Sequence, residues 1–484
     1  MPKPDVTTIV GRRLYYSHID GDGWRSLSTV EAYRDHPTLS ADVIFERAIA
    51  AYPELPVTVA PIAADLDPAW LGTAPAQAAA RRIFAAAQVE AAHHTYSHPF
   101  AWGFFQHYDA KLEAELSIAG GYGRRQKRGP AGGEDPLLGY DSARAYSLHP
   151  FDLAGEMVGA GAYVARFLPP GKRVELVQWS GNTKPFAEAV RLADRAGLLN
   201  INGGDSRLDP EYPSVANVAA VGVEFEGVRQ IYASTSNENT YTDLWSRRFF
   251  GFSFLDETLR RTDAPRRLLP HNVYYHMYSG EKTAALNALL QNLEAARAAE
   301  IAPVRTSDYV RIANGFFEAR IERLGPASWR VLNRGALQTV RFAGGDRGID
   351  YVRSRGVLGH RVVNGDLYVA LDPEAEAPTV ALAPAAPASR PYLAHARWPT
   401  EAFRTFEGGF GFRAAGFGAG AFQWRAVKDG VYRIEASRNG APVWHGEART
   451  DADGGLAFVV EADGIDGLDI RVIRRDLAQA GRDR

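Results

Sequence analysis

Cysteine is absent from this chain of 484 residues, so disulfide bonds play no part in its stability. That absence suits the cytoplasm, but many periplasmic proteins also lack cysteine, so it does not fix the compartment. The formal net charge is only −2, which does not suggest a nucleic-acid partner. No apolar run reaches the length of a membrane span, and residues 1–8 lack the apolar core of a signal peptide.

What the chain does contain is the mixture of an ordinary globular protein, with 46% hydrophobic and 23% charged residues. Its length predicts two or three domains. A basic run at 124–128 could meet an anionic polymer, but glycine and proline surround it, which favours a solvated loop.

The first part of the chain alternates between strand and helix patterns. Strands are expected at 12–19, 56–63, 89–94, 173–179, 198–202, 229–234, 271–278 and 301–305, and helices at 40–51, 75–88, 152–167, 185–196 and 281–299. Strands separated by helices form parallel βαβ units. About seven such units predict an α/β fold, an irregular barrel over residues 1–315.

After residue 315 the pattern changes to short alternating strands separated by glycine turns. Residues 316–484 are therefore predicted to be all-β and sandwich-like. The segment 372–391 is rich in alanine and proline and is either a linker or an edge loop, so it could divide this region. We see no catalytic cluster here. The region could bind glycan, but bracing of the barrel is the favoured interpretation.

Two carboxylates follow the first predicted strand, in the stretch Ile19-Asp20-Gly21-Asp22-Gly23-Trp24. They stand at the carboxyl end of a buried strand, where α/β sheets and barrels place their chemistry. Glycine on each side of Asp22 allows a sharp turn and a close approach to a ligand. A simple Asx-type turn and the Asp-x-Asp site of a sugar-nucleotide transferase are alternatives. A calcium loop is disfavoured, because Trp24 stands where its third oxygen ligand is needed.

Two histidines stand four residues apart in His94-Thr95-Tyr96-Ser97-His98-Pro99. One helical turn or a compact loop can aim both at one ion. A pair of surface histidines is the alternative. Thr95 stands where a zincin protease has its glutamate, so that class is not supported. With Asp22 as third ligand, two histidines and one carboxylate leave an open position for a water molecule.

The two motifs together resemble the polysaccharide deacetylases of the NodB-homology superfamily, which are metal-dependent carbohydrate esterases with a (β/α)7-type barrel. The likeness is closest to the deacetylase module of PelA-type exopolysaccharide-modifying proteins and covers about residues 5–315. It implies that Asp20 is the general base, and that Asp22, His94 and His98 bind one divalent metal ion. The ligand set favours zinc.

The resemblance also implies a histidine general acid at a later strand end. His276 is the best candidate, because strand alternation and the helix that follows place it at the carboxyl end of a strand. His271 is the rival, but it lies at the start of that strand. Superfamily members use an aspartate to orient the acid and an arginine to restrain the base. Asp205 and Arg207 could fill these places, although the usual Arg-x-x-x-x-Pro form is missing.

Sugar recognition needs aromatic platforms, and Trp24, Trp102 and Trp179 flank the motifs. We therefore predict a polysaccharide N-deacetylase that acts on an N-acetylated polysaccharide. The alternatives are a non-catalytic glycan-binding relative and a metal-dependent sugar-nucleotide transferase. The family operates outside the cytoplasm, so the resemblance implies a periplasmic or extracellular protein, which could have exopolysaccharide export components as partners.

Overall fold

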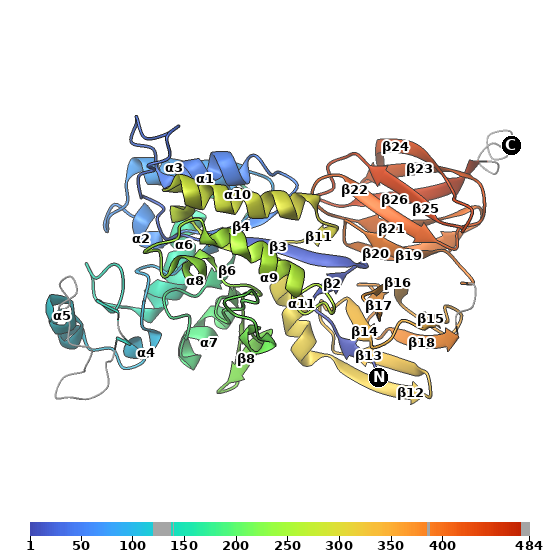
Figure 1. Ribbon diagram of the computed structural model, residues 1–484, viewed down its shortest axis with the longest axis horizontal. Helices are drawn as coiled ribbons and strands as arrows, with labels where there is room; N and C mark the ends of the chain where they lie inside the picture. The colour runs from blue at the N-terminus through green and yellow to red at the C-terminus, as the bar shows by residue number, and fades with distance from the viewer. Residues whose placement is uncertain (120–136, 139, 385–387, 476–484) are drawn as a thin grey trace.

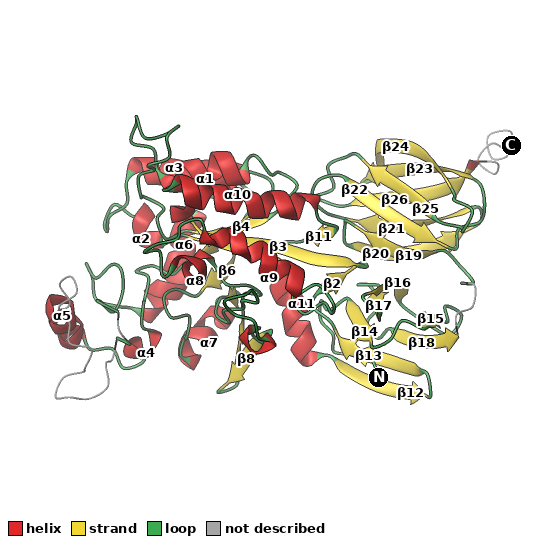
Figure 2. Ribbon diagram, in the orientation of Figure 1, coloured by secondary structure: helices red, strands yellow, loops and turns green. Residues whose placement is uncertain are grey.

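The computed structural model describes residues 1–119, 137–138, 140–384 and 388–475 (Figure 1). Helices and strands alternate up to residue 318, and the rest is made of strands and turns (Figure 2). The α/β part and the β part lie side by side, with the N-terminus next to the β part (Figure 1). The basic run at 124–128 lies outside the described residues.

The main sheet is eight-stranded and mostly parallel, in the order β10-β3-β4-β5-β6-β7, with β11 and β2 also paired to β3. Its strands are β2 (Thr8–Ile9), β3 (Arg12–Asp20), β4 (Val57–Ala60), β5 (Val89–His93), β6 (Val174–Gln178), β7 (Leu199–Ile201), β10 (His271–His276) and β11 (Ile301–Pro303). Eight of the nine residues of β3 are buried, as is typical of a central parallel strand with both faces covered.

Helices and helical turns connect these strands. They are α1 (Ser40–Ile44), η1 (Phe45–Ile49), α2 (Ala63–Leu66), α3 (Ala74–Ala85), α4 (Trp102–Phe105), α5 (Ala110–Ala119), η3 (Gly155–Gly159), α6 (Ala160–Ala165), α7 (Ala187–Arg195), η4 (Val215–Asn217), α8 (Glu238–Thr242), η5 (Gly251–Phe254), α9 (Leu255–Arg261), η6 (Met277–Gly280), α10 (Thr283–Ala298) and α11 (Thr306–Glu318). Each long helix expected from the sequence is present. Two of them, at 40–51 and 152–167, contain a π-helical segment.

Alternation along β3 divides its apolar residues between two cores. Tyr15 and Ile19 join the core that contains residues of α1, α3 and α10. Leu14 and Tyr16 face the other way and join the core of α11, where the ring of Tyr16 stacks on Tyr309 at a centroid distance of 4.1 Å. The sheet is therefore covered on both faces, as the sequence pattern predicts.

One predicted barrel strand lies elsewhere. The segment expected at 229–234 forms β9 (Val228–Ile231), which pairs antiparallel with β8 (Gly222–Phe225) in a separate two-stranded sheet. The turn at Glu226 and Gly227, both with positive φ, favours this local hairpin over a place in the parallel sheet. Among the described residues no strand pairing closes β7 onto β10, so the barrel is an open one.

The C-terminal part is all-β, as predicted. Its strands are β12 (Arg320–Gly325), β13 (Ser328–Leu332), β14 (Thr339–Phe342), β15 (Arg347–Ile349), β16 (Val357–Val363), β17 (Asp366–Leu371), β18 (Thr379–Pro384), β19 (Tyr392–Ala396), β20 (Thr400–Phe406), β21 (Gly409–Ala414), β22 (Gly420–Arg425), β23 (Val431–Arg438), β24 (Ala441–Arg449), β25 (Leu456–Val460) and β26 (Leu468–Arg474). A seven-stranded sheet, β1-β14-β17-β16-β19-β22-β25, runs through the whole region.

This long sheet packs against two smaller ones. Around Trp329 and Leu367 one core joins it to the sheet β12-β13-β18-β15, and around Phe412 and Trp424 a second core joins it to the sheet β20-β21-β26-β23-β24. Its first strand, β1 (Lys3–Pro4), comes from the start of the chain and pairs with β14. The second core also contains residues of β3 and α11, so apolar packing connects the β part to the barrel.

None of the helices in the described parts of the chain is long and apolar enough to cross a membrane.

Candidate metal centre and cleft

Five of the predicted site residues meet at the carboxyl ends of the parallel strands. Strand pairing places His276, the last residue of β10, directly beside Asp20, the last residue of β3. His94 follows β5, which is separated from β3 by one strand, β4, in the sheet order. This is the edge at which parallel α/β sheets place their ligands.

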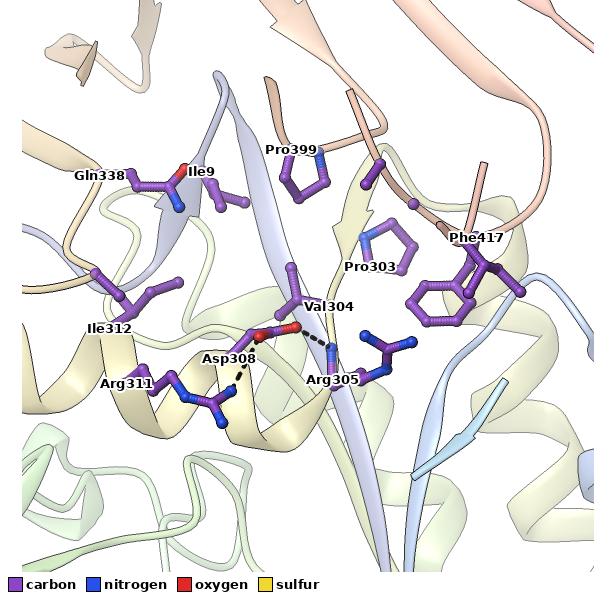
Figure 3. Close-up of a pocket in the computed structure, with 14 residues that line it drawn as sticks. Ile9, Pro303, Val304, Arg305, Asp308, Arg311, Ile312, Gln338, Pro399 and Phe417 are labelled. Carbon is purple, nitrogen blue, oxygen red and sulfur yellow. Dashed lines mark hydrogen bonds and ion pairs between the residues drawn. The ribbon is translucent and has the colours of Figure 1, made fainter. Parts of the chain in front are cut away.

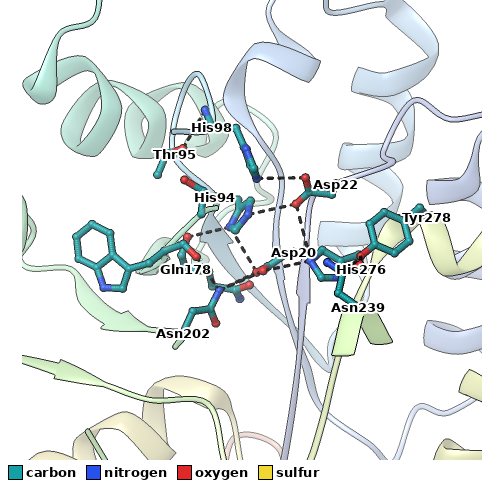
Figure 4. Close-up of polar contacts among 12 residues, drawn as sticks. Asp20, Asp22, His94, Thr95, His98, Gln178, Asn202, Asn239, His276 and Tyr278 are labelled. Atoms are coloured by element: carbon teal, nitrogen blue, oxygen red, sulfur yellow. Dashed lines mark hydrogen bonds and ion pairs between the residues drawn. The ribbon is translucent and has the colours of Figure 1, made fainter. Parts of the chain in front are cut away.

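Asp22, His94 and His98 form the one group of three potential metal-binding side chains found within the described residues. One nitrogen or oxygen atom from each residue lies within 4.8 Å of the other two. The Nε2 atom of His94 is 3.3 Å from Oδ2 of Asp22, and Nε2 of His98 is 3.1 Å from Oδ1 (Figure 4). The structure thus brings together the three residues that the motifs predict as ligands.

The donor chemistry of this group fits a divalent cation. Nδ1 of His94 lies 2.8 Å from the backbone oxygen of Gln178 and donates to it, so in its neutral form the ring presents the lone pair of Nε2 to the carboxylate of Asp22. Two acceptors that face each other at 3.3 Å require a proton or a metal ion between them. Burial acts to raise the pKa of Asp22, but His98 and His94 together outweigh it and hold that pKa well below its usual range. Two imidazoles and one carboxylate are a zinc ligand set.

Asp20 is held by neutral hydrogen-bond donors. The side-chain nitrogen of Asn202 lies 3.1 Å from both carboxylate oxygens, and the hydroxyl of Tyr274 donates to Oδ2 at 2.5 Å. Asp20 is buried, and its Oδ1 is 3.4 Å from Nδ1 of His94. The carboxylate is therefore fixed beside the predicted metal ligands.

His276 faces Asp20 and is oriented from behind by Glu238. Its Nε2 lies 3.7 Å from Oδ2 of Asp20 and 4.0 Å from Oδ2 of Asp22. Its Nδ1 is 2.8 Å from Glu238, which also accepts the backbone N–H of His276 at 2.7 Å and the hydroxyl of Ser279 at 2.7 Å. Burial opposes protonation of the ring, but the charge and hydrogen bond of Glu238, together with the charges of Asp20 and Asp22, outweigh it and raise the pKa of His276 to about 9.

The structure gives the contacts predicted for Asp205 and Arg207 to other residues. Glu238, at the start of α8, takes the orienting role expected of Asp205, which only lines the same cavity. Arg207 is ion-paired with Asp209 at 2.5 Å and with Glu211 at 2.8 Å, so its charge is already matched. Asn202 and Tyr274 hold Asp20 instead.

The prediction that three tryptophans form sugar-binding platforms is wrong, because the three rings belong to the core. Trp24, Trp102 and Trp179 each have an exposed fraction of 0%. Their indole N–H groups donate inward, to the backbone of Ala76 at 3.2 Å, to the backbone of Ser180 at 3.0 Å and to the side chain of Asn200 at 3.1 Å. A ring without exposed surface cannot stack on a sugar, even though Trp179 borders the cleft.

The cleft around the site is lined by polar and aromatic side chains. Besides the residues already described, its walls contain Phe100, Tyr140, Asn182, Thr183, Asn237, Asn239, Thr240, Leu244 and Tyr278. The rings of Phe100 and Tyr140 stack with a centroid distance of 5.4 Å, and Leu244 is 81% exposed at the rim. These residues offer both the apolar surface and the hydrogen-bond partners that a sugar needs.

A separate pocket lies between α11 and the C-terminal strands (Figure 3). Its polar residues include Arg305, Asp308 and Arg311, and Arg311 is ion-paired with Asp308 at 3.3 Å. No histidine lines it in the described part of the chain, so it does not offer the ligand set found in the cleft.

No family model and no curated protein matches the chain. Among solved structures it is similar to a GH30 endoxylanase from Clostridium papyrosolvens C71, with 10% identity over 98% of each chain and a TM-score of 0.18. A 4-alpha-glucanotransferase from Thermococcus litoralis aligns with 8% identity over 95% of this chain and 99% of that chain, with a TM-score of 0.29. A GH39 enzyme from Xanthomonas axonopodis pv. citri aligns with 10% identity over 98% and 96%, with a TM-score of 0.21. Such low scores do not establish a shared fold, so the site itself must carry the functional argument.

Proposed function

We propose that this protein is a metal-dependent hydrolase that removes N-acetyl groups from an amino-sugar polysaccharide. The observation that carries the proposal is the convergence of Asp22, His94 and His98 within 4.8 Å, with Asp20 and His276 beside them. These five residues belong to the two motifs and the strand end on which the resemblance to polysaccharide deacetylases rests. The proposal therefore has one support in sequence and another in geometry.

The chemistry divides among these residues. A divalent ion held by Asp22, His94 and His98 would lower the pKa of a water molecule from ~15.7 toward ~7. Asp20 accepts a proton from the attacking water, while Asn202 and Tyr274 keep its carboxylate in place.

His276 supplies the second proton transfer. An amine leaves an amide poorly unless it is protonated, and Nε2 of His276 faces the cleft for this purpose. Glu238 binds Nδ1 and stabilises the charged ring. Overall, one water and one N-acetyl group give acetate and a free amino sugar.

The experiment combines metal analysis of the purified protein with acetate release from N-acetylated glucosamine and galactosamine oligomers. Bound ion together with acetate release supports the proposal, and Asp22→Asn is the matched control that should lose both. Binding of the oligomers without acetate release would favour the non-catalytic glycan-binding relative. Transfer from a sugar nucleotide without acetate release would favour the transferase.

The location and the partners belong to the same proposal. A polysaccharide substrate of this kind lies outside the cytoplasm, so we place the protein in the periplasm or outside the cell. Components that export the polysaccharide would then be its partners. Cell fractionation with an antibody against the chain tests the location directly.

A further inference from the structure

The loop that carries the two histidines has an unfavourable backbone. Thr95 has φ 63° and His98 has φ 57°, so both adopt the left-handed conformation without being glycine. This conformation is disfavoured for side chains with a Cβ, and most strongly for a β-branched residue such as threonine. It persists only where the surrounding structure imposes it.

A buried carboxylate from another segment of the chain binds this loop. Glu156 accepts the backbone N–H of Tyr96 at 2.8 Å and that of Ser97 at 2.9 Å, and it also accepts the hydroxyl of Ser97. Glu156 is only 3% exposed and belongs to the π-helical segment η3, about sixty residues along the chain. Such π-helical segments are frequent at functional sites.

A second segment holds the loop from another side. Nη1 of Arg144 lies 3.2 Å from the hydroxyl oxygen of Ser97, and its Nε is 2.7 Å from Glu113. The backbone N–H groups of Tyr146 and Ala145 donate to the carbonyl oxygens of Ser97 at 3.1 Å and His98 at 3.0 Å. Tyr96 and Ser97, which stand between the two left-handed residues, are therefore bound through their backbone.

We propose that Glu156 is a positioning residue of the metal site: it imposes the loop conformation that aims His94 and His98 at Asp22, and so raises the affinity for a divalent ion. Glu156 acts through the backbone and is not itself a ligand. The inference rests on the proposed metal site. Residues that orient ligands in this indirect way typically contribute about 10–100-fold in metal affinity.

The chain offers a matched control at the other end of β5. Glu90 is also a buried carboxylate that binds a serine, since it accepts the N–H of Ser307 at 3.1 Å and its hydroxyl at 2.5 Å. Ser307 lies in α11 and not in the histidine loop. Glu90→Gln therefore changes the same kind of contact without touching that loop.

The test measures the dissociation constant of Zn²⁺ for apo-protein by competition with a chromophoric chelator. Glu156→Gln keeps the shape of the side chain but removes its negative charge, which weakens acceptance of the two backbone N–H groups, and replaces the oxygen that faces the Ser97 hydroxyl with an amide N–H₂. We expect it to weaken Zn²⁺ binding about 10–100-fold. Ser97→Ala, which removes only the hydroxyl donor, should have a smaller effect in the same direction. Glu90→Gln should leave the dissociation constant unchanged.

Thermal unfolding of each apo-variant shows whether weaker Zn²⁺ binding comes from the histidine loop or from a general loss of stability. Equal Zn²⁺ affinity of Glu156→Gln and the wild type would overturn the inference while leaving the proposed function intact. Equal weakening by Glu90→Gln would also overturn it, because the effect would then not depend on the loop. A wild-type protein that binds no Zn²⁺ at all would remove the metal site and this inference together. If Glu156→Gln does not fold, Ser97→Ala decides in its place.

Discussion

The two ends of β5 differ in the hydrogen-bond partners of their buried ionisable side chains. Near its start, Glu90 accepts hydrogen bonds from Thr58 and Ser307, so the buried carboxylate has partners that satisfy it. Just after its end, His94 faces the carboxylate of Asp22 at 3.3 Å, and the loop that begins there contains the left-handed residues Thr95 and His98. Natural sequences break local rules mainly where function requires it. The contrast agrees with a packing role for the first end and with the proposed metal binding at the second.

Removal of a proposed metal ligand should have the largest effect on the end of β5 that carries the histidines. Asp22→Asn takes away the anionic ligand of the cleft, so we expect Zn²⁺ affinity to fall by more than the ~100-fold upper range of indirect effects. Turnover should fall to the background rate. Metal analysis after dialysis and acetate release measure the two quantities. Retention of metal in this variant would show that Asp22 is not a ligand.

Asp20→Asn should separate catalysis from metal binding. The amide cannot accept the proton of the attacking water, so turnover should be lost, while the three ligands remain in place. The variant is expected to bind Zn²⁺ like the wild type. Metal loss in Asp20→Asn together with metal retention in Asp22→Asn would reverse the roles of the two residues.

His276→Ala should lower kcat for the amide by about 10²–10⁴-fold, the usual contribution of general acid catalysis. An activated ester has a leaving group that needs no proton, so its hydrolysis should fall less. The ratio of the two rates is the measurement, and His271→Ala is the control. A parallel loss for both substrates, or a selective loss in His271→Ala, would show that His276 is not the acid.

Much of the barrel follows from local sequence patterns. The apolar runs of β3 and β10 predict strands, and the alanine-rich segment of α3 predicts a helix. These signals are strong because they depend only on residues close together in the sequence. The sequence pattern predicts β9 as a barrel strand, but it belongs to a separate hairpin with β8. A strand of a hairpin and a strand of a parallel sheet can have the same apolar pattern. Local pattern fixes the element but not its partner.

The supporting residues of the site could not be read from the sequence. Glu238 meets His276 across 38 residues, and Asn202 meets Asp20 across 182 residues. No spacing rule connects such pairs, because the folded sheet brings them together. The tryptophans show the opposite error, since proximity to a motif in the sequence does not reveal whether a ring is exposed or buried in the core.

The smallest expected effect concerns stability at the other end of β5. Burial raises the pKa of Glu90 to about 7, above its ordinary value of 4.5, despite the hydrogen bonds from Ser307 and Thr58. The folded protein therefore binds this proton more tightly than the unfolded chain does. Its contribution to the free energy of unfolding is complete below pH 4.5 and is lost as the pH rises through 7.

Glu90→Gln removes this titration while keeping the size of the side chain. Between pH 4.5 and pH 7 we expect the wild type to lose stability relative to the variant by at most about 3 kcal/mol, the value of a shift of this size. Urea unfolding of both proteins at several pH values across this window measures the difference. Equal pH slopes would mean that Glu90 is not the titrating group. A change in Zn²⁺ affinity that follows the same titration would mean that the two ends of β5 are coupled, which contradicts the division drawn above.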